Sequence, residues 1–320
     1  MRKLNILIWH IHGAYLTALA QAEHNWYLPR KADQSEGYIG RGVGSSMPDY
    51  VREVPADQIK NLDLDLIIFQ TPRNYQEDQY EILSAEQRQL PRIYLQHNSP
   101  EPHPTDSRHW AADDPNTLLV HVTHYNRLMW DNGTTPTAVI EHSVAIDPSL
   151  RYNGSRPEGI FVVNEMKRRG RMAGYDLYES LRQDLPLTTV GMGSAEIGGI
   201  GEIHYTLLHR RVAEYRFLYS LMRYSSLPLA IIEALTIGMP VVALATTELP
   251  TVIENGVHGF ISCNPDELRE HMQFLLDNPV EARRMGNNAR KLAQERFSIE
   301  RFVQDWNRVF AEVVGRPVPA

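Results

Sequence analysis

One stretch in the second half of the chain combines a serine-rich loop with an acidic side chain in an otherwise apolar segment. Ser225 and Ser226 can cap a helix start, and Pro228 is tolerated in a first turn because its missing N–H would have no partner there. Leu229–Ile237 is apolar nearly all round, which is typical of a buried helix. Glu233 is the exception, since a buried carboxylate is costly unless it is paired. A helix start that can face phosphates, followed by an acid that can accept hydroxyls, indicates a nucleotide-sugar site.

The residues after this helix continue the pattern of an α/β domain. Gly238 supplies a helix stop, and Pro240 prevents continuation of the helix. Val241–Ala245 is apolar throughout, as expected of a strand that is buried on both faces of a parallel sheet. The sequence therefore predicts a loop, a buried helix and a buried strand in that order.

This region resembles the family 4 (group 1) retaining glycosyltransferases, which have the GT-B fold of two Rossmann-like parallel-sheet domains facing across a cleft. The residues that carry the resemblance are Glu233-Ala234-Leu235, Gly238, Pro240-Val241-Val242-Ala243, Glu248-Leu249, Ile253, Asn255-Gly256, Gly259-Phe260, Asn264-Pro265-Asp266-Glu267-Leu268, Asp277-Asn278-Pro279, Met285-Gly286 and Phe297-Ser298. The match is close over roughly the last hundred residues and loose before them. The expected fold class is therefore α/β with GT-B architecture.

The resemblance implies transfer of a sugar from a nucleoside diphosphate sugar to a hydroxyl acceptor, with retention and without a metal ion or cofactor. UDP-sugars such as UDP-glucose are the usual donors of the family. By resemblance, Glu233 holds the ribose, and Ser225, Ser226 and the N–H groups of Leu229 and Ala230 lie beside the donor. The sequence departs from the family at Ser225, where a glutamate would contact the donor sugar. The resemblance therefore implies nucleotide binding more directly than the choice of sugar.

Composition limits the class of protein. The 320 residues are 42% hydrophobic and 22% charged, enough for two domains with cores of their own. The formal net charge of −7 argues against a general nucleic-acid binder. Cys263 is the one cysteine, so no internal disulfide can form. No segment is long and apolar enough to span a membrane, and we expect a cytoplasmic protein, with peripheral membrane contact left open.

The N-terminal half, residues 1–155, reads as a first Rossmann-like domain on the acceptor side. In an open α/β sheet, ligands bind at the carboxyl ends of the strands. Gly13 follows the first predicted strand and matches the family glycine beside the donor phosphate, although a simple turn glycine explains it equally well. The predicted strands are Leu4–Trp9, Leu66–Phe69, Pro91–Leu95 and Leu118–Val122.

Side chains just after these strands are the candidates for the reacting face. His97 follows a strand and matches a family histidine near the donor sugar, so His97 and Glu233 are the predicted catalytic residues. His12, Tyr15, Arg73 and Asn74 are acceptor-side candidates, and the last two could equally belong to a solvated loop.

An Asp-x-Asp motif at Asp63–Asp65 has the residue types of a metal site. It precedes a strand and so lies at the opposite end of the sheet from the predicted cleft. We therefore predict no metal ligands.

Residues 156–300 read as a second Rossmann-like domain that binds the nucleotide sugar. A cluster of one lysine and three arginines follows the strand Gly159–Val163, and guanidinium groups suit two phosphates. The alternative is a solvated basic loop. The family presents an arginine and a lysine here, and the register is open: one alignment uses Asn164 and Arg169, another Ala173. Lys167 and Arg169 are our leading candidates.

Two further donor-side candidates follow. Gly193 closes a glycine-rich turn after the strand Leu187–Val190, and Tyr205 lies where the family packs the nucleotide base. Residues 301–320 are expected to form a helix that crosses back to the first domain.

The prediction is therefore a glycosyltransferase that uses a sugar, glycolipid or small-metabolite acceptor, in polysaccharide or glycoconjugate synthesis. Two alternatives remain. A sugar-nucleotide epimerase or hydrolase of the same fold would alter a free sugar nucleotide without an acceptor. A non-catalytic binding subunit, suggested by Ser225, would bind nucleotide without turnover.

Overall fold

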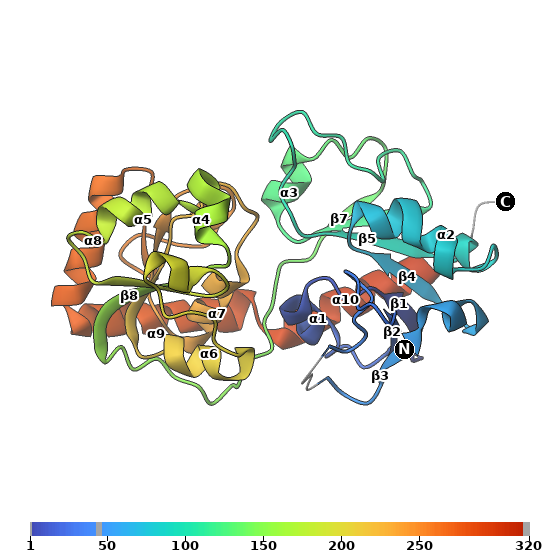
Figure 1. The fold of residues 1–320 in the computed structure, drawn as a ribbon, viewed down its shortest axis with the longest axis horizontal. Coiled ribbons are helices and arrows are strands. Elements are labelled where there is room, and N and C mark those ends of the chain that lie inside the picture. The colour runs from blue at the N-terminus through green and yellow to red at the C-terminus, as the bar shows by residue number, and fades with distance from the viewer. Residues whose placement is uncertain (1, 43–46, 316–320) are drawn as a thin grey trace. The chain divides into compact units, whose positions relative to one another are not determined.

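Short apolar runs in both halves of the chain form parallel strands connected by helices (Figure 1). The computed structural model describes residues 2–42 and 47–315. The chain divides into two compact units, Met1–Ala145 with Ile299–Ala320, and Ile146–Ser298. The sequence placed the corresponding boundaries at residues 155 and 300. Each unit contains one parallel sheet, which agrees with the predicted α/β class.

Unit 1 holds the first sheet. Its strands pair in parallel in the order β3-β2-β1-β4-β5-β6-β7. Its described elements in chain order are β1 (Asn5–Ile8), α1 (Gly13–Leu19), β2 (Asn25–Arg30), β3 (Val51–Pro55), the 3-10 helix η1 (Ala56–Asn61), β4 (Leu66–Phe69), the π-helix η2 (Asn74–Asp78), α2 (Gln79–Ile82), the 3-10 helix η3 (Gln87–Gln89), β5 (Arg92–Gln96), β6 (Thr117–His121), α3 (His124–Met129), β7 (Thr137–Val139) and α10 (Ile299–Gly315).

Unit 2 holds the second sheet, with parallel strands in the order β12-β11-β10-β8-β9. Its elements are β8 (Arg156–Val162), α4 (Met166–Arg169), the 3-10 helix η4 (Gly170–Ala173), α5 (Tyr175–Leu181), β9 (Leu187–Val190), the 3-10 helix η5 (Ser194–Ile197), α6 (Tyr205–Val212), β10 (Tyr215–Ser220), α7 (Leu229–Ile237), β11 (Val241–Leu244), the 3-10 helix η6 (Leu249–Thr251), β12 (Gly259–Ser262), α8 (Pro265–Asp277) and α9 (Pro279–Arg296).

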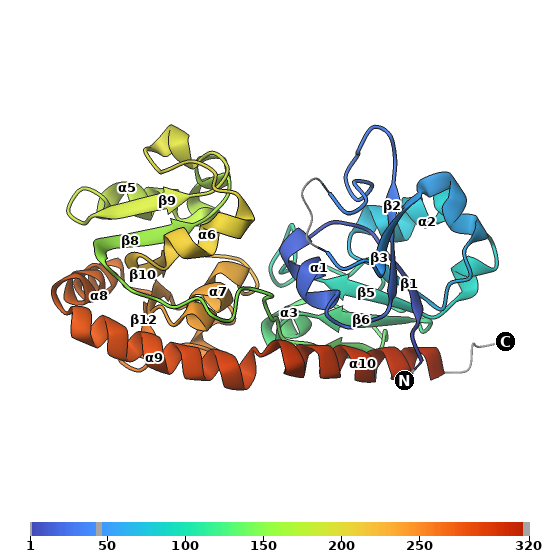
Figure 2. The same cartoon turned by 90° about the horizontal axis from the view of Figure 1, so that it is seen from below.

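Alternation along the strands builds the core of unit 1. Leu7 in β1 is aligned with Ile67 in β4, and both belong to a buried cluster that includes Phe69. Because successive side chains of a strand point to opposite faces, such residues cover one face of the sheet. Helix α10 packs beside α1 (Figure 2), and Trp26 meets Phe310 at a centroid distance of 6.0 Å.

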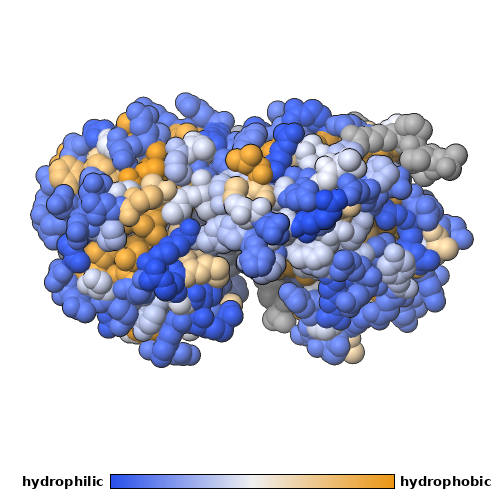
Figure 3. All heavy atoms as spheres, turned by 90° about the horizontal axis from the view of Figure 1, so that it is seen from above, coloured by the Kyte–Doolittle hydropathy of each residue, from blue (hydrophilic) through white to orange (hydrophobic). Residues whose placement is uncertain are grey.

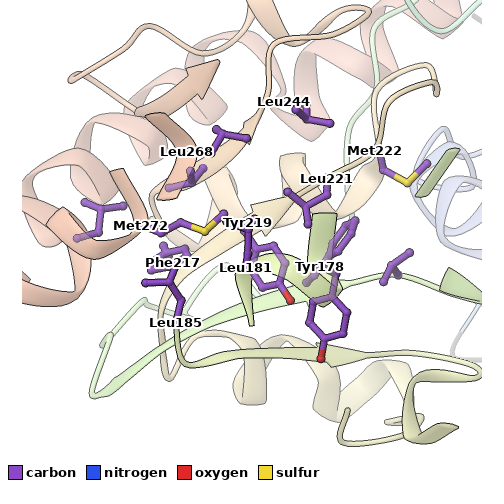
Figure 4. Packing of buried hydrophobic residues seen from close by; sticks show 14 of the residues in the cluster. Tyr178, Leu181, Leu185, Phe217, Tyr219, Leu221, Met222, Leu244, Leu268 and Met272 are labelled. Carbon is purple, nitrogen blue, oxygen red and sulfur yellow. The ribbon is translucent and has the colours of Figure 1, made fainter. Parts of the chain in front are cut away.

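The core of unit 2 forms in the same way. Phe217, Tyr219 and Leu221 alternate along β10 and its continuation, and all three are fully buried (Figure 4). Leu181 of α5 and Met272 of α8 pack in the same cluster. The cluster therefore packs α5, which precedes β10 in the chain, and α8, which follows it, against that strand. This packing holds the carboxyl end of β10 in place.

Helix α10 is tied to the end of the segment that follows β7. Arg301 donates from Nη1 to Glu141 O at 2.9 Å and from Nη2 to His142 O at 2.7 Å. Its Nη1 also lies 3.2 Å from Asp305. Two bonds from one guanidinium to consecutive carbonyls hold that segment on the helix.

Most predicted strands are confirmed within a residue or two, and β4, β9 and helix α7 have the predicted bounds. Strand β2 was not predicted, and it contains Pro29, which lacks the N–H needed inside a sheet. The pairing explains how β2 tolerates it. Tyr27 is the last residue of β2 that pairs with β1, and Pro29 lies beyond that point, where only β3 pairs with the strand.

The face of the molecule in Figure 3 is mostly hydrophilic, with separate apolar areas. Within the described residues, no helix is long and apolar enough to cross a membrane.

The contact between α7 and α9 allows a stability test. A Cβ at Gly286 of α9 would clash with the carbonyl oxygen of Gly238, which ends α7. Gly286→Ala should therefore lower the free energy of unfolding by about 1–3 kcal/mol, measured by urea denaturation. Gly315→Ala is the control, because a Cβ there meets no atom of the described residues within 4 Å. Equal stability of the two variants would contradict the close contact.

Candidate functional site

The candidate donor-side residues lie beyond the carboxyl ends of strands in the unit 2 sheet. The strand order places β8 beside β10, and β9 lies on the far side of β8. The chain direction across the sheet therefore reverses between β8 and β10, and such a switch point is where open α/β sheets bind ligands. The segments that follow β8, β9 and β10 carry Asn164–Arg169, Gly193 and Ser225–Ala230.

Glu233 is buried in α7, as predicted, and it is paired. Its side chain is 9% exposed, and Tyr205 Oη donates to Glu233 Oε1 at 3.0 Å. His209 Nε2 lies 3.4 Å from the same oxygen, without the geometry of a hydrogen bond. Burial, and then the Glu233 carboxylate, raise the pKa of Tyr205 well above its usual value, so the hydroxyl remains a donor at neutral pH. Helix α6 therefore satisfies the acid that α7 buries.

His209 was not identified from the sequence. It follows Tyr205 by one helical turn on α6, and the two rings meet edge to face at 4.7 Å. Residues four apart on a helix share a face. That spacing was the available signal, once Tyr205 had been singled out.

The start of α7 differs from the prediction in one respect. Ser225 and Ser226 do not cap the helix: Pro228 is the N-cap, with no side-chain hydrogen bond. The reason is that the backbone turns helical only after Pro228, which lies two residues beyond Ser226. The first N–H groups of a helix have no intrahelical acceptor. Leu229 and Ala230 therefore present backbone donors, while Thr247 Oγ1 holds Ser226 O at 2.9 Å.

The basic segment after β8 forms the short helix α4 and is tied to the turn after β9. Asn164 Oδ1 accepts from Met192 N at 3.0 Å, and Glu165 N donates to Met192 O at 2.7 Å. Glu165 has a left-handed backbone with φ of 55°, which is uncommon for a residue other than glycine. Asn164, which was predicted to contact the sugar-nucleotide donor, thus joins the loops after β8 and β9 through its side chain.

A small pocket lies between these two loops. Its volume is about 180 Å³, and the residues that line it are Glu165, Lys167, Arg168, Gly193 and Glu196. Lys167 is exposed and has no ion-pair partner among residues 2–42 and 47–315. Arg168 Nε lies 3.3 Å from Glu165 Oε2. Lys167 is therefore the cation of this cluster best placed to meet an added anion.

Arg223 and Asp176 connect the basic segment to the loop before α7. Arg223 donates to both carboxylate oxygens of Asp176, at 2.6 and 2.7 Å, and to Arg171 O at 2.5 Å. Arg171 also pairs with Asp176 at 2.8 Å. A Cβ at Gly174 would clash with the carbonyl of Leu221, so the two segments pack with no side chain between them. The basic segment is therefore packed against the loop that precedes α7. Neither Arg223 nor Asp176 was singled out from the sequence.

In unit 1, His97 lies within a cluster of rings at the ends of β1 and β5. The His97 ring is 4.1 Å from that of His12 and 4.7 Å from that of Tyr15, measured between centroids. His142 meets Tyr15 at 5.7 Å. Burial, and then the neighbouring histidines, lower the pKa of His97 well below its usual value. Burial also lowers the pKa of His12 to about 4 and that of His142 to about 3. The histidines of this cluster are therefore neutral at pH 7.

The acceptor-side candidates are not equally available. Tyr15 is 1% exposed and its hydroxyl accepts from Trp306 Nε1 at 3.3 Å. Asn74 is 1% exposed and donates to Asp78 at 2.7 Å. Arg73 is exposed and lies 3.4 Å from Asp78. His12 and Arg73 are thus the more accessible candidates.

Gly13 and the Asp-x-Asp motif have local partners. A Cβ at Gly13 would lie 3.1 Å from His10 Nε2, so the glycine lets that ring approach the start of α1. Asp65 accepts from Arg2 at 2.6 and 2.9 Å and from Asn5 N at 2.8 Å. In the parts of the chain that the structure describes, no group of three or more His, Cys, Asp or Glu side chains could hold a metal ion.

Residues 200–292 match the family model "Glycosyl transferases group 1". This range includes Tyr205, His209 and Glu233. No curated protein matches the sequence significantly.

Several solved structures share the fold. Sucrose-phosphate synthase from Thermosynechococcus elongatus aligns over 97% of this chain and 99% of its own, with a TM-score of 0.70 and 16% identity. HepE from Anabaena, solved in complex with UDP-glucose, aligns over 97% and 100%, with a TM-score of 0.75 and 13% identity. TarM from S. aureus aligns over 77% of this chain, at a TM-score of 0.62 and 16% identity, and the chain spans about half (54%) of TarM.

These similarities define the class of protein. The chain has the GT-B fold, and residues 200–292, within its second unit, match the group 1 glycosyltransferase family model. The predicted fold and group are confirmed, and the matched domain supports a glycosyltransferase.

The neutral histidines of unit 1 generate a pH prediction. As the pH falls below about 6.5, His142 takes up a proton in the unfolded chain but not in the folded protein. Each such histidine therefore lowers the free energy of unfolding by about 1.4 kcal/mol per pH unit, until the pH reaches the pKa of the folded state. In the part of the chain that the structure describes, neither ring nitrogen of His142 has a hydrogen-bond partner, so His142→Leu removes no side-chain hydrogen bond. The variant should reduce the pH slope of unfolding free energy between about pH 6.5 and 5 by that amount. A comparable reduction in His124→Leu, at an exposed position, would contradict the assignment.

Proposed function

We propose that the protein is a retaining glycosyltransferase of family 4 that moves a sugar from a nucleoside diphosphate sugar to a hydroxyl acceptor without a metal ion. The observation that carries this proposal is the pairing of Glu233 inside a helix whose first N–H groups are open. Tyr205 and His209 both approach Oε1, and no described residue donates to Oε2. An acid with one occupied and one open oxygen is ready to accept ribose hydroxyls.

The phosphates belong at the start of α7 and beside α4 in this proposal. The N–H groups of Leu229 and Ala230 and the partial positive charge of the helix end favour an anion there. Lys167 and Arg169 would supply further positive charge. Fixed positive groups of this kind stabilise a departing diphosphate in place of a metal ion. UDP-glucose is the donor we favour, because HepE was solved with that compound.

Unit 1 supplies the acceptor-side groups and His97 in the proposed reaction. His97 would contact hydroxyls of the sugar, while His12 and Arg73 are the accessible acceptor-side candidates. The acceptor would be a sugar, glycolipid or small metabolite. We further propose a cytoplasmic location, since the single cysteine, Cys263, is exposed and free, which suits a reducing compartment.

A non-catalytic nucleotide-sugar-binding subunit is the second candidate function. Ser225 stands where the resembling family has an acid that contacts the donor sugar, so binding without turnover remains a defined alternative. Failure to transfer sugar from any donor that binds would favour it over the transferase.

The first test is calorimetric titration with UDP, GDP and ADP. One nucleotide should bind saturably, and Glu233→Ala should weaken it by about tenfold because the ribose loses a charge-assisted acceptor. Glu295→Ala, an exposed acid on α9, is the control and should leave the affinity unchanged. Affinity that is identical in Glu233→Ala would make the ribose assignment wrong, and lack of binding to all three nucleotides would exclude the donor site.

The phosphate assignment has its own test. Lys167→Met should weaken UDP by about tenfold and uridine hardly at all, because the lost interaction is a charge-assisted bond to phosphate. Lys291→Met, an exposed lysine on α9, removes the same charge elsewhere in unit 2. Equal losses for UDP and uridine, or equal losses in the two variants, would argue against a phosphate contact at Lys167.

A further inference from the structure

The His97 ring is held by a buried glutamine. His97 Nε2 lies 2.9 Å from Gln70 Oε1, and Gln70 Nε2 donates to Trp9 O at 2.5 Å. Gln70 follows β4 and is 6% exposed, and His97 follows the neighbouring strand β5. The three residues therefore form a chain of hydrogen bonds across the carboxyl ends of three adjacent strands.

The chemistry of these groups determines where the imidazole hydrogen lies. A backbone carbonyl can only accept, so the end of Gln70 that faces Trp9 O must be its amide nitrogen. The other end is then a carbonyl oxygen, which can also only accept. His97 must therefore carry its hydrogen on Nε2. In the neutral ring, the lone pair is left on Nδ1.

We propose that Gln70 is a positioning residue that holds His97 in the Nε2–H tautomer, so that Nδ1 accepts a hydrogen bond from a substrate hydroxyl. This inference rests on the proposed function for the identity of the substrate as a sugar. No residue in 2–42 or 47–315 donates to His97 Nδ1, and the side chain is half-buried rather than sealed in the core.

Two other histidines of unit 1 show what the same arrangement does when no ligand is involved. His24 Nε2 faces Asn307 Oδ1 at 3.0 Å, and its Nδ1 accepts from Leu4 N at 3.1 Å. His109 Nε2 faces Gln96 Oε1 at 3.0 Å, and its Nδ1 accepts from Ala111 N at 3.0 Å. In both cases a backbone N–H uses the lone pair. At His97 that acceptor remains open on a half-buried side chain. His121 also has an amide oxygen at Nε2 and no partner at Nδ1 among the described residues, but its side chain is fully buried. The open acceptor and the partial exposure together therefore distinguish His97 as a ligand-facing histidine.

The groups around His97 favour its neutral form. His12, Tyr15 and His142 face it from the segment after β1, from α1 and from the segment after β7. Asn126 Nδ2 donates to His97 O at 3.1 Å, so the backbone at this position is held as well. Loss of Gln70 would therefore let the His97 ring rotate about its side-chain torsions, while the backbone of His97 stays in place.

The test combines nitrogen-15 NMR of the imidazole rings with kinetics. In the ligand-free protein at neutral pH, His97 should show a protonated Nε2 and an unprotonated Nδ1. Gln70→Leu should mix the two tautomers and lower kcat by about tenfold with little change in KM for the sugar nucleotide, because orientation rather than nucleotide binding is lost.

Asn307→Ala is the matched control. It removes the amide that holds His24 and should change the His24 resonances while kcat and the His97 tautomer stay as they are. A protonated Nδ1 on His97 in the unaltered protein would overturn the proposal, and so would Gln70→Leu with a kcat within twofold of the unaltered protein. Absence of any transfer activity would instead count against the proposed function, because the NMR result decides the tautomer without turnover.

Discussion

The buried carboxylate of Glu233 is the constraint on which the donor side of the molecule depends. Helix α7 has no polar face, so a charge within it must be paired inside unit 2. Tyr205 supplies the hydrogen bond, and His209 lies beside the same oxygen. This pairing requires α6 to lie against α7. It also leaves the second carboxylate oxygen and the helix start open to the proposed donor, so one interaction serves both the stability of the fold and the proposed binding site.

Unit 1 meets a different electrostatic requirement. Its buried histidines stay neutral, and at His24, His97, His109 and His121 an amide oxygen faces Nε2. A neutral imidazole held in one tautomer offers an acceptor of known direction. Such preorganisation costs nothing at the moment when substrate binds. The buried histidines of unit 1 therefore fix the directions of hydrogen bonds. The side chains around α4 and α7 in unit 2 instead fix the local distribution of charge.

The sequence was most informative where local chemistry and packing agree. The apolar run of α7 predicted its bounds, and the isolated acid predicted that a partner must exist. It did not reveal that the partners would be Tyr205 and His209, because their contact with Glu233 depends on how α6 packs. Caps were misjudged for a similar reason: Ser225 and Ser226 have cap chemistry, but the backbone turns helical only after Pro228. Gln70 and Arg223 carry no sequence signal of their own, since a single amide or guanidinium gains meaning only from the carbonyls and carboxylates brought to it.

The two hydrogen bonds from Arg223 to Asp176 affect how the sequence of this domain can vary. They join Asp176, in the first turn of α5, to the loop that precedes α7, although β9, α6 and β10 lie between the two residues in the chain. The two segments that would surround an anion are therefore held together by this contact and by the direct pairing of β8 with β10, and not by the elements that connect them in the chain. Insertions or deletions in the surface turns of that intervening region can accumulate during evolution without changing the spacing of those segments.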